Sequence, residues 1–254
     1  MIKLKSPEEI KILREGGRRL ASVLQEVSRH IKPGVKTIEL DHLAQDLIKK
    51  LGDTPAFLGY KPKGAPRPYP AALCVSVNDQ VVHGIPGQEI LEEGDLVSID
   101  LGLTHNGLIT DSAVTVGVGN LKKEDSVLLD VTKEALKKAI EVVKPGGRVG
   151  DIGFAVETYV KDFGFGIVRD LAGHGVGYSV HEEPSILNYG KAGTGAILKE
   201  GLVIAIEPML AAGSHQVSFL DDGFTFVTTD GSMSAHFEHT VAVTKDGVEI
   251  LTIN

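Results

Sequence analysis

The sequence predicts a single α/β domain of two similar halves, with mainly antiparallel strands and helices packed on the outer face. Three matches, in the same order in each half, carry this prediction. "IKPGVKTIELDHLAQDLIKKLG" (31–52) resembles "VKPGGRVGDIGFAVETYVKDFG" (143–164), "LCVSVNDQVVHGIP" (73–86) resembles "LAGHGVGYSVHEEP" (171–184), and "EEGDLVSIDLG" (92–102) resembles "KEGLVIAIEPM" (199–209). Ordered matches indicate an internal repeat. We therefore expect one domain over 1–254, with halves at about 31–142 and 143–254.

The first element is a helix that begins at Ser6-Pro7-Glu8-Glu9, where Ser6 can cap the helix and Glu9 can complete a capping box. Apolar residues follow at helical spacing until Pro33-Gly34 ends the segment. The same criteria predict four helices in total, at 7–30, 37–51, 124–143 and 150–163.

Strands are expected at "ALCVSV", "DLVSIDLGL", "LITDSAVTVGV", "LVIAIEPML", "FTFVTT" and "AHFEHTVAVT". Asn106-Gly107 predicts a hairpin between the second and third of these. A two-residue loop would pair residues whose numbers sum to 213, and a four-residue loop would give 211. Either loop puts Asp100 and Asp111 on one face, whereas a three-residue loop would separate them.

Composition and charge exclude several classes of protein. The net charge of −8 offers no broad positive surface for specific DNA binding, and one cysteine excludes an internal disulfide. The N-terminus lacks the apolar stretch of a signal peptide, and no apolar run reaches membrane-spanning length. We therefore expect a cytoplasmic, monomeric protein with no membrane partner.

Four acids lie in apolar strand segments that contain no Lys or Arg: Asp100, Asp111, Glu207 and Glu238. An unpaired charge in a buried strand is costly, and carboxylates held close together repel each other. A divalent cation removes both costs, and an oxygen-rich ligand set suits Mn, Fe or Co better than a thiolate zinc site. The alternative is that each acid pairs with a base or ends a strand at the surface.

The histidines of "GHGVGYSVHEEP" raise the question of whether they act as a pair. The glycines around His174 argue against a helix. Seven residues of extended chain would put His174 and His181 on opposite faces, unless the chain bends between them. In the repeat His181 matches His83, while His174 matches Ser76. We therefore expect His83 and His181 to act together and His174 to have a separate role, with His236 near the site. The alternative for each is a structural histidine.

With these residues in view, the chain resembles the methionine aminopeptidase family, type I. The segments that carry the resemblance are "VSVNDQVVHGIP", "VSIDLG", "ITDSA", "GHGVGYSVHEEP", "AIEPM" and "SAHFEHTVAVT", which span 73–244. The family's pseudo-two-fold "pita-bread" fold agrees with the repeat. The second half has no large insertion, and the chain shows no N-terminal zinc-finger extension, both of which favour type I.

The resemblance implies a site for two divalent ions, of Co, Mn, Fe, Zn or Ni. Asp111 and Glu238 would bridge the ions, Asp100 would hold one, and His174 with Glu207 would hold the other. A water between the ions would attack the first peptide carbonyl. Glu207 would shuttle the proton, and His83 and His181 would bind the scissile peptide. The implied activity is removal of the initiator methionine from nascent proteins whose second residue is small.

The resemblance also implies a pocket for the methionine side chain, formed by Phe57, Tyr60, Tyr69, Cys74, Val180 and Phe224. Asn78 and Ser234 match positions that hold a monovalent cation in some relatives, with a plain turn as the alternative. The segment between Tyr60 and Tyr69 is longer than is usual in the family.

That longer segment carries Lys61, Lys63 and Arg67 among prolines. A ribosome contact is one interpretation of these basic residues, and a solvated, Pro-stiffened loop is the other.

Two other functions compete with this one. Xaa-Pro peptidases share "GHGVG…HEEP" and the acids, although they usually carry a further N-terminal domain. A metal-free binding protein of the same fold is the third hypothesis.

Overall fold

The computed structural model describes residues 2–62 and 64–254, so Lys63 of the predicted basic segment lies outside the described residues. The four predicted helices are present: α1 (Pro7–Arg29), α2 (Thr37–Leu51), α3 (Lys123–Glu141) and α4 (Val149–Val160). The capping box at Ser6 and Glu9 is formed. Local capping and apolar spacing therefore predicted the helices to within three residues at each end.

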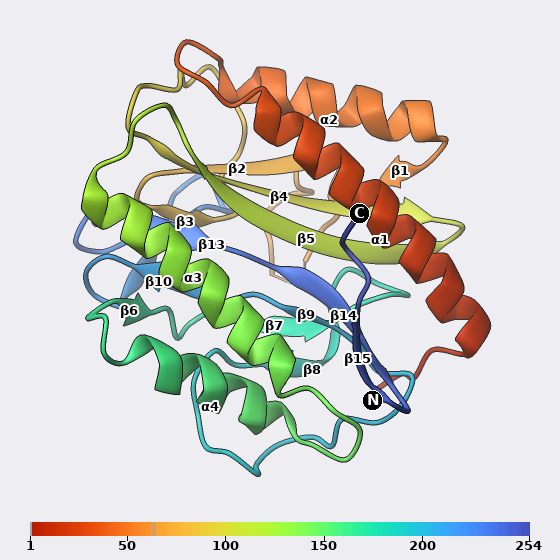
Figure 1. Cartoon of the computed structure of the whole chain (residues 1–254). Helices are drawn as coiled ribbons and strands as arrows, with labels where there is room; N and C mark the ends of the chain where they lie inside the picture. Colours follow the sequence, from red (N-terminus) through yellow and green to blue (C-terminus); the bar gives the residue numbers. More distant parts are fainter. Residues whose placement is uncertain (1, 63) are drawn as a thin grey trace.

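The strands pair antiparallel in two larger sheets and two three-stranded ones (Figure 1). In the first larger sheet β1 and β2 pair with one edge of β4, and β5 pairs with the other. The second has the order β15-β14-β9-β7-β8, and the smaller sheets have the orders β13-β10-β6 and β11-β12-β3. The bounds are β1 (Thr54–Pro55), β2 (Leu73–Val77), β3 (Gln80–Val82), β4 (Leu96–His105), β5 (Leu108–Gly117), β6 (Gly166–Ile167), β7 (Gly173–Gly175), β8 (Glu182–Ile186), β9 (Val203–Ile206), β10 (Met209–Ala211), β11 (Val217–Phe219), β12 (Phe226–Thr228), β13 (Ser234–His236), β14 (His239–Thr244) and β15 (Gly247–Ile250).

The β4–β5 hairpin has a two-residue loop, one of the two loop lengths that the sequence left open. Asn106 and Gly107 both have positive φ, 47° and 80°, as a tight hairpin turn requires. Asp100 pairs with Ala113 and Gly102 with Asp111, so the two acids are diagonal neighbours on one face. The expectation that they share a face is confirmed.

Two predicted strands are each broken in the structure, which corrects the sequence prediction. "LVIAIEPML" divides into β9 and β10 at Glu207-Pro208, and "AHFEHTVAVT" divides into β13 and β14 at Phe237-Glu238. The pieces still pair with each other, β9 with β14 and β10 with β13. Pro208 has no N–H to donate to a ladder. The two breaks lie opposite each other, between the Ile206–His239 and Met209–His236 pairs, and each contains a glutamate.

Equivalent backbone hydrogen bonds recur in the two halves. Gly34 N donates to Leu91 O at 2.8 Å, and Gly146 N donates to Leu198 O at 2.8 Å. Gly34 and Gly146 occupy matching positions in the first pair of repeated segments, and Leu91 and Leu198 each immediately precede the third pair. The bonds support an internal repeat, whereas the division at 142/143 stays a proposal.

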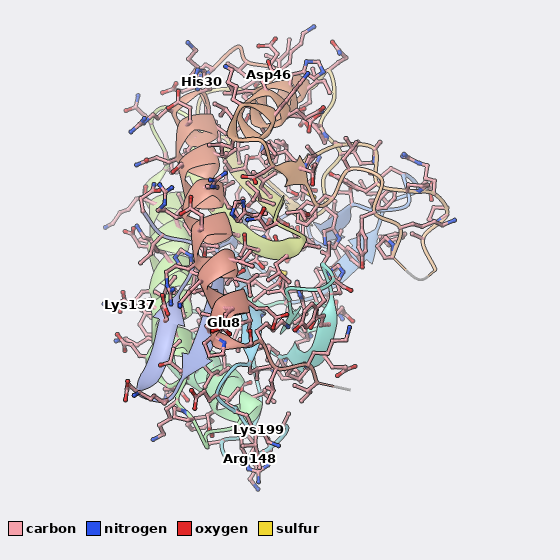
Figure 2. The ribbon with its side chains drawn as sticks, turned by 90° about the vertical axis from the view of Figure 1, so that its right-hand side faces the viewer. Glu8, His30, Asp46, Lys137, Arg148 and Lys199 are labelled. Carbon is pink, nitrogen blue, oxygen red and sulfur yellow. The ribbon has the colours of Figure 1, made fainter. Side chains whose placement is uncertain are left out.

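Helices cover one face of the sheets and leave the other free for the site (Figures 1 and 2). Val97, Ile99 and Leu101 of β4 pack in one buried cluster with α1 and α2. Alternation along a strand then turns Asp100 to the opposite face. A second cluster lies under α3 and α4. Within the described residues, no helix is long and apolar enough to cross a membrane.

Candidate active site

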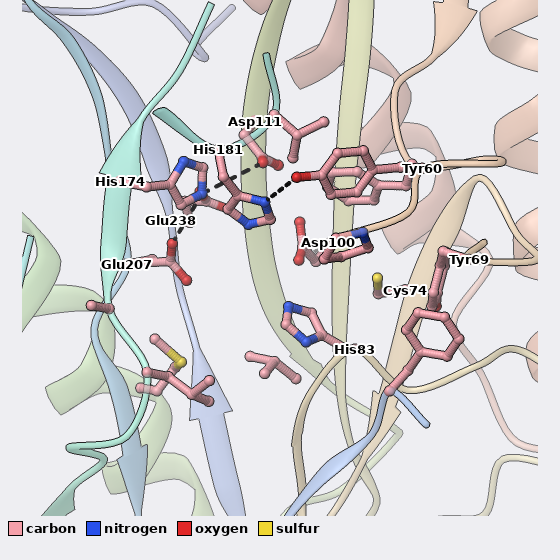
Figure 3. Close-up of a pocket in the computed structure, with 18 residues that line it drawn as sticks. Tyr60, Tyr69, Cys74, His83, Asp100, Asp111, His174, His181, Glu207 and Glu238 are labelled. Atoms are coloured by element: carbon pink, nitrogen blue, oxygen red, sulfur yellow. Dashed lines mark hydrogen bonds and ion pairs between the residues drawn. The ribbon is translucent and has the colours of Figure 1, made fainter. Parts of the chain in front are cut away.

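Five predicted residues converge on the face away from the helices (Figure 3). β4 and β5 supply Asp100 and Asp111, β7 supplies His174, and the two strand breaks supply Glu207 and Glu238. One ligand atom from each of Asp111, His174 and Glu238 lies within 4.8 Å of the others. His174 Nε2 is 3.4 Å from Glu207 Oε1 and 4.0 Å from Asp111 Oδ2. The breaks in the strands therefore complete a cluster that the hairpin begins.

The four carboxyl groups share a site without a compensating base. Within the described part of the chain, their ion pairs are with histidines only. Oδ1 of both Asp100 and Asp111 is buried without a hydrogen-bond partner among the described residues. Burial, followed by the nearby Glu207 charge, raises the pKa of Asp111 to about 8. Burial also raises the pKa of Glu207 to about 8. Burial, then neighbouring carboxylates, raises the pKa of Asp100 and Glu238 well above the usual range. Unsatisfied carboxylate oxygens of this kind fit divalent cations.

His174 is oriented for a role toward the acids. Its Nδ1 lies 2.9 Å from the Gly175 carbonyl oxygen, an acceptor, so Nδ1 carries the proton. Nε2 is then left with its lone pair directed at Glu207 and Asp111. A ring N–H bonded to a backbone carbonyl is the usual support for a metal-binding histidine.

The expectation that His174 and His181 lie on opposite faces is wrong. Their ring centroids are 4.4 Å apart. β7 ends at Gly175 and β8 begins only at Glu182, so the intervening chain is not extended and strand parity does not apply. Their contacts nevertheless differ, because His181 Nδ1 is hydrogen-bonded to Tyr60 Oη at 2.9 Å.

One cavity of about 160 Å³ joins this cluster to an apolar end. Tyr69 and Phe224 meet edge to face there, with ring centroids 5.1 Å apart. All the residues predicted for the methionine pocket line this cavity, together with the two histidines predicted to bind the substrate: Phe57, Tyr60, Tyr69, Cys74, Val180, Phe224, His83 and His181. The lengthened segment after Tyr60 has therefore not removed Tyr60 from the cavity.

Six residues near the site were either not predicted or, in the case of His236, predicted only to lie nearby. His236, which we expected near the site, is 1% exposed, with Nε2 3.4 Å from Glu207 Oε2. Pro62, Val82, Leu171, Ala172 and Met209 also line the cavity. They are apolar residues without a chemical signature, so the sequence had no means of selecting them.

This fold, with four buried acids and several histidines around one cavity that has an apolar end, defines a candidate metal-dependent hydrolase. Residues 11–245 match the model of metallopeptidase family M24. The chain is 48% identical over 252 residues to methionine aminopeptidase 1 of Bacillus subtilis, covering 99% of both chains. The crystal structure of methionine aminopeptidase from Thermotoga maritima is 44% identical, with a TM-score of 0.96 over 100% of both chains. The chain therefore belongs to metallopeptidase family M24, in the branch of the methionine aminopeptidases.

A prolidase from Pyrococcus horikoshii shows a more distant likeness, with 26% identity and a TM-score of 0.76. The match covers 98% of this chain but only 63% of the prolidase. The predicted family and fold class are thus confirmed, and the prolidase carries residues outside the shared part.

Proposed function

We propose that this enzyme removes the N-terminal methionine from peptides and nascent proteins whose second residue is small. The observation that carries the proposal is the single cavity in which an apolar end adjoins the buried acids and histidines. A flexible thioether packs well against aromatic walls such as Tyr69 and Phe224. The cavity's polar end would then face the first peptide bond.

Five residues would hold two divalent cations, of Co, Mn, Fe, Zn or Ni. These residues are Asp100, Asp111, His174, Glu207 and Glu238, the set that the family resemblance implies. The ions would supply positive charge that polarises a carbonyl and makes a water more acidic. The buried Oδ1 atoms of Asp100 and Asp111, which have no hydrogen-bond partner among the described residues, support this assignment.

The chain's own groups would handle the protons and the substrate oxygen. Burial lowers the pKa of His83 to about 4 and also lowers that of His181, so both rings are neutral at pH 7 and retain one N–H. Each could donate that N–H to the scissile carbonyl and to the tetrahedral oxygen. Glu207 would accept a proton from the attacking water and pass it to the departing amine.

A peptide panel tests the proposed function. With Mn, Co or Fe added, we expect Met-Gly and Met-Ala peptides to be cleaved about 100-fold faster than Met-Leu or Ala-Pro peptides. Preferential cleavage of Ala-Pro would instead support an Xaa-Pro peptidase. A metal-loaded protein inert toward every Met peptide would defeat the proposal, and failure to retain metal after anaerobic reconstitution would favour the metal-free hypothesis.

The hydrogen bond of Tyr60 makes a separate prediction. Tyr60→Phe removes the hydroxyl at 2.9 Å from His181 Nδ1, which helps to hold that ring in place. We expect kcat/KM for a Met-Gly peptide to fall about five- to tenfold, the worth of one hydrogen bond. Tyr189→Phe is the matched control, because that hydroxyl bonds only to the exposed Arg169 carbonyl at 3.5 Å. Equal activity of the two variants would contradict a role for the Tyr60 hydroxyl.

A monovalent cation near Asn78 and Ser234 also stays a proposal. Ser234 N and Oγ each lie 2.9 Å from the Asn78 carbonyl oxygen, so this oxygen is already engaged.

A ribosome contact through the segment after Tyr60 has weaker support. Arg67 lies over the ring of Phe224, a residue that lines the cavity, at 5.3 Å, so this arginine already has an intramolecular contact. We propose a cytoplasmic monomer.

A further inference from the structure

The connecting loop, residues 176–181 between β7 and β8, carries two residues of the cavity, Val180 and His181. The Gly177 carbonyl accepts from Ile109 N at 2.7 Å and Val176 N donates to Val203 O at 3.2 Å, which anchors the start of the loop. One carboxylate holds the backbone that follows. Glu182 Oε1 accepts the N–H of Tyr178 at 2.6 Å and the N–H of Ser179 at 3.0 Å. The position of His181 therefore depends on where the Glu182 side chain is held.

The other oxygen of that carboxylate is held by the N-terminal segment. Lys5 Nζ donates to Glu182 Oε2 at 2.7 Å, across 177 residues of sequence. The two side chains are 0% and 5% exposed. Lys5 N also donates to the Gly201 carbonyl at 2.7 Å, which anchors the backbone behind the side chain. The start of α1 is already capped by Ser6 and Glu9, so the helix does not need Lys5. The burial of Lys5 is therefore explained by its contact with Glu182.

Two glycines leave room for this lysine. A Cβ at Gly177 would lie 2.4 Å from Lys5 Cε, and a Cβ at Gly201 would lie 2.7 Å from the Lys5 carbonyl oxygen. A side chain at either position would require Lys5 to shift, and the positive φ values of 139° and 86° favour glycine there as well. Lys5 therefore packs closely against both backbones.

The first turn of α1 adds a second contact with the same loop. The Tyr178 hydroxyl donates to Glu9 Oε1 at 2.8 Å, and Lys5 Nζ lies 4.9 Å from the centre of the Tyr178 ring. Glu8 marks this end of α1 in Figure 2. Residues 5–9 therefore touch the loop through an ion pair, a hydrogen bond and a cation–π contact.

We propose that Lys5 is a positioning residue: through its buried ion pair with Glu182 it holds the connecting loop so that His181 and Val180 face the substrate. The inference rests on the proposed function, because His181 is a substrate-binding residue only there. Loss of Lys5 should therefore move the loop without altering the acid cluster. Misplacement of a binding group by about 1 Å can cost about 100-fold in rate.

The test compares Lys5→Met with the double variant Lys5→Met/Glu182→Gln. Removing one member of a buried ion pair leaves an uncompensated charge and can prevent folding. The double variant removes both charges and keeps an oxygen for the two loop N–H groups. Arg14→Met is the control, since it breaks an exposed ion pair between α1 and Glu249. Each variant is assayed well below its Tm, with a Met-Ala peptide and a fixed Mn concentration.

We expect kcat/KM to fall about tenfold or more in both Lys5 variants and to stay within twofold of wild type in Arg14→Met. In the chelated protein, the amides of Tyr178 and Ser179 should exchange hydrogen at least about tenfold faster. Introduced into His181→Ala, the Lys5 change should cost less than about twofold further, because residues that act through one another are not additive.

A folded double variant with kcat/KM within twofold of wild type, or with unchanged loop exchange, would overturn the inference. A loss of Tm alone, with intact kinetics, would show that Lys5 serves stability only. If wild type cleaves no Met peptide, the proposed function fails, while the exchange measurement still decides whether Lys5 holds the loop.

Discussion

Asp111→Asn is expected to lower kcat/KM for a Met-Gly peptide by at least about 10³-fold. Asp111 lies in the cluster with His174 and Glu238, and its Oδ1 has no partner among the described residues. Asparagine keeps the shape but removes the charge and one metal-binding oxygen. Mutation of a residue that only hydrogen-bonds to a metal ligand typically lowers metal affinity or activity about 10- to 100-fold. Loss of a direct ligand should therefore lower activity further.

The same change should stabilise the protein when metal is absent. It removes one of four buried acids whose pKa values are raised by burial and by each other. We expect the chelated variant to melt about 2 °C or more above chelated wild type at pH 8. Asp125→Asn, a buried acid at the start of α3, is the control and should leave activity intact. An Asp111→Asn enzyme with more than a tenth of wild-type activity would rule out the proposed ligand role.

The second large expected effect is that the free energy of unfolding depends on both pH and bound metal. The ordinary pKa values of Asp111 and Glu207 are 3.8 and 4.5, and burial raises both pKa values to about 8 in the folded protein. The folded state therefore binds more protons than the unfolded state between these limits. The free energy of unfolding of the chelated protein must therefore fall as pH rises toward 8. Burial lowers the pKa of His83 and His174, so these two groups act in the opposite sense, but only below their ordinary pKa of 6.5. The window from pH 6.5 to 8 thus isolates the carboxyl groups.

Calorimetry of the chelated protein should show Tm falling as pH is raised through that window. A divalent ion at about 1,000 times its Kd should add about 4 kcal/mol to the free energy of unfolding. That corresponds to a Tm increase on the order of 10 °C. The increase should be larger at pH 8 than at pH 6.5, because protons compete for the same oxygens. A Tm that changes with neither pH nor metal would contradict the proposed centre.

Much of the fold could be predicted because its signals are local. Ser6 and Glu9 define the start of α1 through bonds between near neighbours. Asn106-Gly107 sets the hairpin register through two backbone angles, and this register alone brought Asp100 and Asp111 together. Acids without nearby bases in apolar strands identified the remaining members of the cluster.

The errors all arose where distant contacts decide the geometry. Periodicity treated "LVIAIEPML" and "AHFEHTVAVT" as continuous strands, whereas each breaks where it passes between two sheets. Strand parity separated His174 from His181, whereas the turn after Gly175 brings their rings together.

By itself the sequence determined the helices, the hairpin register, the repeat and the identity of the acids and histidines at the site. These depend on hydrogen bonds and side-chain periodicity within short segments. Only the tertiary structure decided that Glu207 and Glu238 sit at paired strand breaks and that Lys5 is buried against Glu182. A buried ion pair between residues 177 positions apart has no local signature, because its stability comes from exclusion of water by the whole fold.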